Sequence, residues 1–396
     1  MNFFLLCIIK TAIVTFALLT LLAYLQLVER KVLAHIQLRP GPYRVGPHGF
    51  WQPLADVIKL VTKEGVIPPG SNKIFYLLAP VLGVALALTA IAVIPFGPEI
   101  EIFGIKTTMG LTDLNIGILF ILALSSISVY AVALGGWAST SKYSLLGGLR
   151  SSAQMISYEL PMALAVVAPL LMLNTLNLRE MVNAQAGFYF GFIPKWSIFA
   201  APVPQLLSFL IFVIATFAET NRVPFDLPEA EAELVAGFHT EYSSMGFASF
   251  FMAEYSNIVT VCCVATTLFL GGWHPLWPAE YGSNFVAPLV FLVAAGILFY
   301  HGRQGIRRWD KFSFPAVGAV FLLLAAIFLI PALQPYLIPF FWFAAKTGAI
   351  IFVFIWIRGT LPRFRYDQLM RFAWTFLFPL AVLNLLVTGF LVALVE

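Results

Sequence analysis

Long apolar runs, separated by short polar segments, dominate the chain from end to end. A helix needs about 20 apolar residues to cross the hydrocarbon core of a bilayer. Runs of this length predict an all-α, polytopic bundle of about ten transmembrane helices. They lie near residues 3–28, 74–95, 114–136, 160–177, 204–218, 254–272, 285–301, 315–333, 337–357 and 374–395.

The segment after the first run has a different periodicity. Four apolar residues share one helix face, with Asp56 on the opposite face, which predicts an amphipathic helix along the inner membrane surface, ended by Pro68 and Pro69. Before it, residues 39–47 are too rich in proline and glycine for a helix. They predict a rigid turn, which at membrane depth lines a cavity. The four apolar residues are Trp51, Leu54, Ile58 and Val61.

Composition supports a membrane protein. Hydrophobic residues make up 60% of the 396 residues and charged residues 11%, with a mean hydropathy of +0.91, whereas a soluble domain has about 25% charged residues. We therefore expect the bilayer to be the solvent for most of the chain. The first run has no basic start and no small-residue cleavage site, so we expect a first span rather than a cleavable signal.

The distribution of basic residues predicts the orientation. The loops after the first, third, fifth, seventh and ninth spans hold 7, 2, 1, 4 and 4 of the 23 Lys and Arg residues, 18 altogether. The opposite loops hold only Lys106, Arg179 and Lys195. Because basic loops stay on the cytoplasmic side, we predict that both termini lie outside. The basic residues are thus topology signals and not a nucleic-acid-binding surface.

No cofactor motif is apparent. Cys7, Cys262 and Cys263 lie in apolar runs without metal-ligand spacing, and the five histidines include no pair at helical spacing. The segment GPYRVG at 41–46 begins like a phosphate-binding loop, but it continues with Pro47-His48 instead of Lys and Ser or Thr. We expect no metal ligation and no covalently bound cofactor.

Charged residues at the membrane boundary are the candidates for chemistry. Arg30 and Lys31 are typical of a positive anchor, but Glu29 beside Arg30 also forms a pair that can orient a ligand or relay a proton. Glu159 lies at or just inside the boundary, where we expect Arg150 or a proton to neutralise it.

The fifth polar segment, residues 219–252, is unusually acidic for an inner loop. Asp226 could cap a helix that starts at Pro228, and an acid in the first turn suits the helix dipole, which is a structural explanation for Glu229. Carboxylates this close cannot all ionise cheaply, so their pKa values spread and rise, as a proton path requires. The loop holds one basic residue, Arg222, and six acids: Glu219, Asp226, Glu229, Glu231, Glu233 and Glu241.

Two further charged sites complete the pattern. Glu254 opens the sixth span, and Lys346 lies about nine residues into the ninth, where a buried lysine needs an acidic partner. The last inner loop has a stop-transfer composition, yet its alternation of Arg, aromatic and Asp residues after a proline favours docking to a partner protein. Its charged residues are Arg358, Arg363, Arg365 and Asp367.

At these residues the chain resembles the H-type subunits (subunit 1) of the proton-pumping NADH:quinone oxidoreductase, respiratory complex I. The matches are long, lie in order, and run from residue 29 to about 272 and from about 337 to the C-terminus. The segments that carry the resemblance are ERK at 29–31, RPGP at 39–42, GLRSSAQ at 148–154, AETNRVPFDLPE at 218–229 and PRFRYDQ at 362–368.

The resemblance implies a non-redox subunit that forms the chamber through which the quinone tail enters, with quinone as a substrate of the whole complex. It implies that Glu29, Arg30, Arg39, Asp56, Glu219 and Phe225 belong to the chamber. It implies a proton path through Arg150, Glu159, Glu219, Asp226, Glu229, Glu231, Glu233, Glu241, Glu254 and Lys346. The residues Arg358, Arg363, Arg365 and Asp367 match the loop that faces the peripheral arm.

The partners implied are the peripheral-arm subunits that carry the terminal iron–sulfur cluster and the quinone headgroup site. Neighbouring small and antiporter-like membrane-arm subunits, quinone and the lipid bilayer are also implied, and nucleic acid is not. The expected location is a bacterial inner (plasma) membrane with periplasmic termini.

The chain departs from the eight-span family core by two extra spans. We interpret residues 1–272 and 337–396 as the core and residues 273–336 as an inserted hairpin, which either packs peripherally or offers a partner site. Two other functions stay open: the related membrane subunit of an ion-pumping hydrogenase, and an autonomous transporter. Activity of the chain with its partners distinguishes the first, and transport by the chain alone distinguishes the second.

Overall fold

The computed structural model describes residues 3–102, 105–226, 235–304 and 308–395, and it confirms the all-α polytopic bundle. Nine helices in this part of the chain are long and apolar enough to cross a membrane. The run predicted at 204–218 forms the shorter helix α7 (Leu206–Glu219). Pro202 and Pro204 precede α7 and disfavour a longer helix.

The elements before α7 include four long helices and two small hairpins. They are α1 (Phe3–Ile36), η1 (Pro47–Gly49), α2 (Gln52–Thr62), α3 (Lys73–Ile91), β1 (Glu99–Ile102), β2 (Ile105–Thr108), α4 (Gly117–Ala138), α5 (Lys142–Leu173), α6 (Leu178–Ala184), β3 (Phe188–Tyr189) and β4 (Ile193–Pro194).

Five long helices follow α7. The elements are η2 (Gly237–His239), α9 (Ser244–Phe269), η3 (Ala279–Tyr281), η4 (Ser283–Phe285), α10 (Val286–Gln304), α11 (Arg308–Phe328), α12 (Gln334–Thr360), α13 (Tyr366–Phe372), a π-helical turn (Ala373–Leu377) and α14 (Phe378–Val395).

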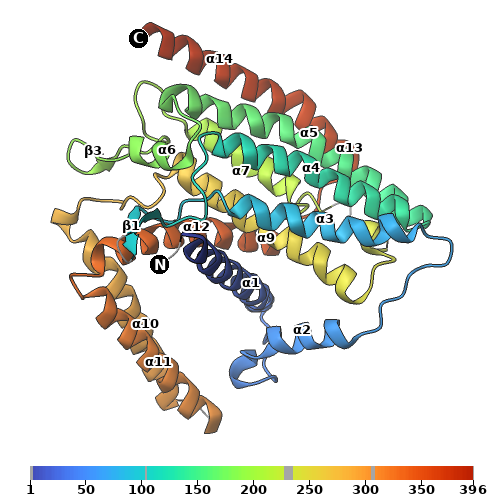
Figure 1. The fold of residues 1–396 in the computed structure, drawn as a ribbon, viewed down its shortest axis with the longest axis horizontal. Helices are drawn as coiled ribbons and strands as arrows, with labels where there is room; N and C mark the ends of the chain where they lie inside the picture. The colour runs from blue at the N-terminus through green and yellow to red at the C-terminus, as the bar shows by residue number, and fades with distance from the viewer. Residues whose placement is uncertain (1–2, 103–104, 227–234, 305–307, 396) are drawn as a thin grey trace.

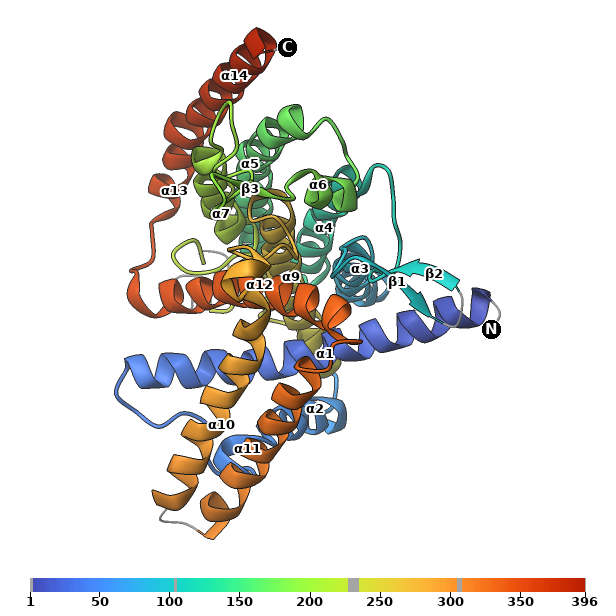
Figure 2. The same cartoon turned by 90° about the vertical axis from the view of Figure 1, so that its left-hand side faces the viewer.

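The bundle has a compact part and a projecting hairpin. Helices α3, α4, α5, α7 and α9 run side by side, and α10 and α11 project away from them as a pair (Figure 1). The two termini lie toward the same end of the helices, with β1, β3 and α6, while α2 lies at the other end (Figure 1). Figure 2 shows α1 passing between the bundle and the α10–α11 hairpin.

Several element ends differ from the predictions. Helix α1 continues to Ile36, so Glu29 to Lys31 lie within the helix and not after it. Helix α9 begins ten residues before the predicted position 254, and α5 begins 18 residues before 160. The hairpin of β1 and β2 was not predicted, although Glu99–Ile102 alternates polar and apolar residues as a strand does.

Helix α5 explains why a hydropathy pattern misses its first half. Its buried residues there are small or polar, and they recur at helical spacing on one face. Gly148 packs against Gly136 of α4, and a Cβ on Gly147 would lie 2.6 Å from the Cα of Gly237. Small residues allow membrane helices to approach closely. This face comprises Ser144, Gly147, Gly148, Ser151, Gln154 and Met155.

We expect Gly147→Ala to lower the unfolding free energy by about 1–3 kcal/mol, because the new methyl group would overlap the backbone of η2. The thermal midpoint of the purified complex measures this effect. Gly296→Ala in α10 is the matched control, since a Cβ there meets no atom within 4 Å. Equal midpoints for the two variants would contradict the close approach.

Candidate functional site: a buried charge cluster

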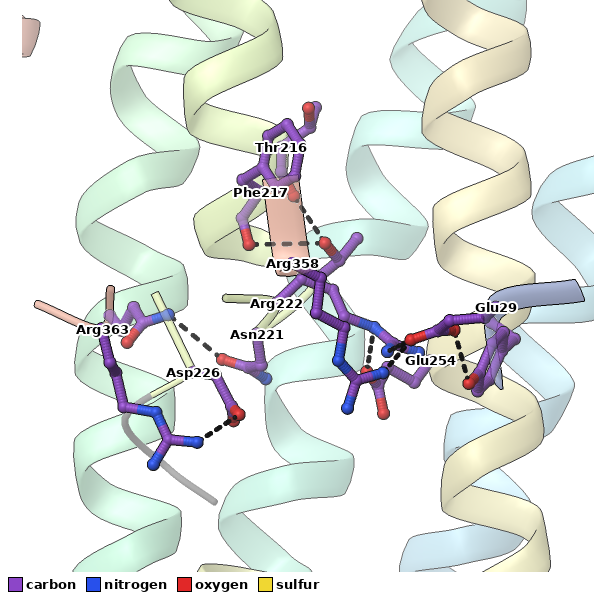
Figure 3. Close-up of polar contacts among 12 residues, drawn as sticks. Glu29, Thr216, Phe217, Asn221, Arg222, Asp226, Glu254, Arg358 and Arg363 are labelled. Carbon is purple, nitrogen blue, oxygen red and sulfur yellow. Dashed lines mark hydrogen bonds and ion pairs between the residues drawn. The ribbon is translucent and has the colours of Figure 1, made fainter. Parts of the chain in front are cut away.

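Four charged side chains from four segments meet at the inner half of the bundle (Figure 3). The Arg222 guanidinium lies 3.0 Å from Glu29 on α1 and 2.7 Å from Glu254 on α9. Arg358 of α12 also contacts Glu29, and the Tyr255 hydroxyl donates a hydrogen bond of 2.8 Å to its other oxygen. We call Glu29, Arg222, Glu254 and Arg358 the charge cluster.

Local backbone structure places Arg222 in this cluster. Helix α7 ends in a Schellman motif, in which Asn221 adopts the left-handed conformation with φ 49°. The amide of Arg222 donates to the Phe217 carbonyl at 3.1 Å, and the amide of Asn221 donates to the Ala218 carbonyl at 3.3 Å. The turn therefore directs the side chain of Arg222 back between α1 and α9.

The environment keeps Arg222 charged. Its side chain is only 7% exposed, and burial alone would lower the pKa of the guanidinium. The carboxylates of Glu254 and Glu29 act in the opposite direction and raise the pKa above its ordinary value. The guanidinium also lies over the Tyr255 ring at 4.4 Å. Two acids and two arginines make the cluster neutral when all four groups are ionised.

The buried amide of Gln154 fixes the turn after α7. Its Nε2 donates to the carbonyls of Ala218 at 2.8 Å and Phe225 at 2.7 Å. We expect Gln154→Leu to cost about 1–3 kcal/mol for each carbonyl left without a donor. The thermal midpoint of the complex measures the loss. Gln304→Leu, at the exposed end of α10, is the control and should leave the midpoint unchanged.

Polar cavities connect the charge cluster with Glu219. Glu254 and Glu219 line one cavity together with His239 and Asn257, and a second cavity is lined by Glu219, Ser125 and Asn257. Cavities with several polar partners are suitable places for water.

Adjacent serines of α4 extend this connection to Glu159. The Ser125 hydroxyl donates to Glu219, and the Ser126 hydroxyl donates to Glu159. The structure thus brings Glu29, Glu254, Glu219 and Glu159 into one sequence of polar contacts and cavities. Ser126 is exposed on the surface of this chain, so the sequence reaches that surface.

The predicted chamber residues lie in two places. Arg30 pairs with Asp56 of α2 at 2.8 Å, and Gln52 also donates to Asp56. Arg39 is exposed and donates to the side chain of Gln37.

Phe225 does not line either polar cavity. Its ring is buried between Tyr158 and Phe364, with centroid distances of 5.5 and 5.6 Å. It therefore belongs to the packing of the turn after α7.

The predicted partner loop is divided between inward and outward residues. Arg358 joins the charge cluster, and Arg363 pairs with Asp226 at 3.0 Å (Figure 3). The side chains of Arg365 and Asp367 are 79% and 71% exposed and lie 3.4 Å apart. Only the last two are free to meet a partner without breaking these internal ion pairs.

The remaining proton-path candidates are scattered. Glu229, Glu231 and Glu233 lie outside the described residues. Arg150 lies over the Tyr366 ring at 5.7 Å. The backbone carbonyl of Glu241 accepts a hydrogen bond from Tyr76, in the turn before α9.

The acidic partner expected for Lys346 is a wrong prediction. Its Nζ donates to the carbonyls of Leu270 and His274 at 2.6 and 2.7 Å and lies over the Trp196 ring at 4.3 Å. Carbonyls beyond the end of α9 and an aromatic face thus replace a carboxylate. Burial and the charge of Lys346 lower the pKa of His274 to about 4, so the imidazole is neutral at pH 7.

Sequence reasoning missed three residues of the site: Arg222, Tyr255 and Gln154. Arg222 is the single basic residue in an acidic loop, and Asn221 followed by Pro224 is typical of a helix end. These two signals predict a directed arginine after α7. No signal in the sequence identifies Tyr255, because an aromatic residue in an apolar run is typical of packing. Among the described residues, His, Cys, Asp and Glu form no group of three that could hold a metal ion.

Known proteins resemble this chain over nearly its full length. A family model described as NADH dehydrogenase matches residues 9–389. The chain is 64% identical to a NADH-quinone oxidoreductase H-type subunit, the first of its kind in Solibacter usitatus, over 99% of this chain and 98% of that protein. It is 47% identical to the second H-type subunit of Koribacter versatilis over 99% and 98% of the two chains, and 46% identical to the first of Geobacter metallireducens over 97% and 96%.

The matched shares show that these relatives have nearly the length of this chain. The fold agrees with them, since the described part of the chain is a multi-pass helical bundle. The chain belongs to the family of NADH-quinone oxidoreductase H-type subunits, which are membrane subunits of an oxidoreductase complex.

Proposed function

We propose that this subunit forms the quinone-access chamber of a proton-translocating NADH:quinone oxidoreductase and links quinone reduction to proton movement. The observation that carries the proposal is the charge cluster, whose four ionisable groups lie beside polar cavities inside a membrane bundle. Ionisable groups at membrane depth are costly and mark ligand or proton pathways.

The surface beside the cluster suits an apolar ligand with a polar head. Helix α2 presents an exposed apolar face, and its Asp56 pairs with Arg30 on the inner half of α1. An isoprenoid tail would lie along the apolar face, while the headgroup would pass close to the Arg30–Asp56 pair. Quinone is then the substrate, and this chain supplies its path without a redox centre.

Electrostatics provides the link to protons. A negative charge on a reduced headgroup would attract Arg358 or Arg222 and weaken their hold on the carboxylates. Two unit charges about 4 Å apart interact by about 4 kcal/mol at an effective dielectric constant of 20, which corresponds to about three pKa units. Glu254 would then take up a proton, and the shared cavity would pass the change to Glu219 and, through Ser125 and Ser126, to Glu159.

The outer surface of this chain supports partners on two sides. Glu159 and Ser126 reach the surface at membrane depth, where a neighbouring membrane-arm subunit would cover them. Arg365 and Asp367 are exposed near the end of α12 and would meet the peripheral arm that carries the iron–sulfur clusters. With the basic loops on the cytoplasmic side of a bacterial inner membrane, both termini would be periplasmic.

Residues 1–272 and 337–396 would form the family core under this proposal. Residues 273–336, which hold the α10–α11 hairpin, would be an addition to it.

The proposal is tested with Glu219→Gln and Arg30→Ala in the assembled complex. Both variants should reduce the rate of quinone reduction by about tenfold or more and leave the NADH:ferricyanide reaction, which needs no quinone, unchanged. Glu280→Gln and Arg303→Ala are the controls, because both side chains are exposed away from the charge cluster. Normal quinone turnover with normal proton pumping in both test variants would refute the proposed function.

A further inference from the structure

The α10–α11 hairpin meets the rest of the chain at both of its ends. At the outer end, Ala287 and Phe328 pack with Ile338 and Trp342 of α12. At the inner end, the start of α11 lies against η1, in the turn between α1 and α2 (Figure 2). Gly302 and Pro315 hold the two helices close together, since a Cβ on Gly302 would lie 2.7 Å from the Pro315 ring.

One acidic side chain makes the contact at the inner end. The carboxylate of Asp310 lies 3.0 Å from Nε2 of His48, and Phe314 packs on the same imidazole with a centroid distance of 4.5 Å. Asp310 is buried, whereas Lys311 beside it and Arg303 at the end of α10 are exposed. It also lies in the first turn of α11, where the helix dipole favours a negative charge.

The turn that His48 belongs to needs such support. His48 has a left-handed backbone with φ 50°, and Gly46 and Gly49 have φ 71° and 76°. A non-glycine residue in this region is uncommon, so surrounding contacts must favour it. A Cβ on Gly49 would lie 2.3 Å from the Pro42 carbonyl, which shows how tightly the turn folds on itself.

The turn in turn positions charged residues on α1 and α2. The Lys31 ammonium donates to the His48 carbonyl, which ties the turn to α1. Helix α2 starts at Gln52, four residues after His48, and carries the Asp56 that pairs with Arg30. A shift of the turn would therefore displace α2 relative to α1.

We propose that the α10–α11 hairpin holds the α1–α2 turn in place, with Asp310 as a positioning residue that acts through His48 on the Arg30–Asp56 pair. The consequence for catalysis rests on the function proposed above, in which that pair lies on the path of the quinone. The hairpin thus has a defined task and is more than peripheral packing.

The test is hydrogen exchange of residues 40–51 in the assembled complex. Asp310→Ala should make the amides of this turn exchange roughly tenfold faster, because the imidazole loses its charged partner. The matched control is Lys311→Ala, which removes the next, exposed side chain of the same helix and should leave exchange unchanged. His48→Gln should produce most of the same change, and adding Asp310→Ala to it should add little.

Quinone kinetics of the same variants give the second measurement. Asp310→Ala should raise the KM for quinone several-fold and leave the NADH:ferricyanide rate unchanged. Unchanged exchange in Asp310→Ala would overturn the positioning contact, and faster exchange with unchanged quinone KM would overturn its role in the chamber. Arg30→Ala is measured alongside: if it too leaves quinone reduction normal, the proposed function fails, and the exchange result still decides whether the hairpin holds the turn.

Discussion

Replacement of Arg222 by Met is expected to abolish quinone reduction and to destabilise the protein more than any other single change discussed above. The side chain compensates two carboxylates, Glu29 and Glu254, at 3.0 and 2.7 Å. Removing one partner of a buried ion pair costs about 3–5 kcal/mol, because the other charge stays buried without compensation. Here Glu254 loses its arginine and Glu29 keeps only Arg358 and the Tyr255 hydroxyl.

The measurement for Arg222→Met is quinone reduction by membranes, together with the amount of assembled complex. Arg222→Lys keeps the charge but loses the planar contact with two carboxylates, so it should retain assembly and part of the rate. Arg365→Met is the matched control, since that arginine is 79% exposed. Wild-type quinone reduction and a wild-type thermal midpoint in Arg222→Met would contradict the assignment of the cluster.

The second large effect is expected for Glu29→Gln. The neutral amide leaves Arg222 and Arg358 with one carboxylate between them, so the cluster acquires a net positive charge. Quinone reduction should fall about tenfold or more, and the complex should be less stable by a few kcal/mol. The measurement is the rate of quinone reduction together with the thermal midpoint.

A double variant separates charge from position. Glu29→Gln combined with Arg358→Gln removes one acid and one arginine and leaves the Arg222–Glu254 pair neutral. We expect this double variant to recover most of the lost stability without recovering quinone-linked proton pumping. If the two single changes simply add in the double variant, then Glu29 and Arg358 act independently and the cluster is not one electrostatic unit.

Hydropathy predicted the architecture well because the bilayer imposes one dominant requirement, which is about 20 apolar residues per span. It failed where a helix is buried by protein instead of lipid. The first half of α5 is rich in small and polar residues that face α4, α7 and η2, so its apolar content is too low for a predicted span. A search for small residues at helical spacing would have found this face.

The candidate site divides in the same way. The motif that contains Glu219 and Arg222 is visible in the sequence, but the partner of each charge depends on which helices pack together. Glu29 and Arg222 are 193 residues apart, and Arg358 is 329 residues from Glu29. The acid expected beside Lys346 was wrong for the same reason, since backbone carbonyls can serve as well as a carboxylate.

The pairing between His48 and Asp310 is a further case of long-range packing. A histidine in a proline-rich turn and an aspartate in a basic loop carry no sequence signal that they meet. Both residues were placed by the packing of the hairpin against the turn, and that packing depends on close approaches such as Gly302 to Pro315.

The central claim is that an apolar path for quinone runs beside the charge cluster. Density for a bound quinone or a quinone-site inhibitor in the assembled complex tests it most directly. The account predicts a tail along the apolar face of α2 and a headgroup close to Arg30, Asp56 and the buried Glu29. A ligand bound far from α1 and α2, with the acidic segment after α7 surrounded by bulk water, would contradict it.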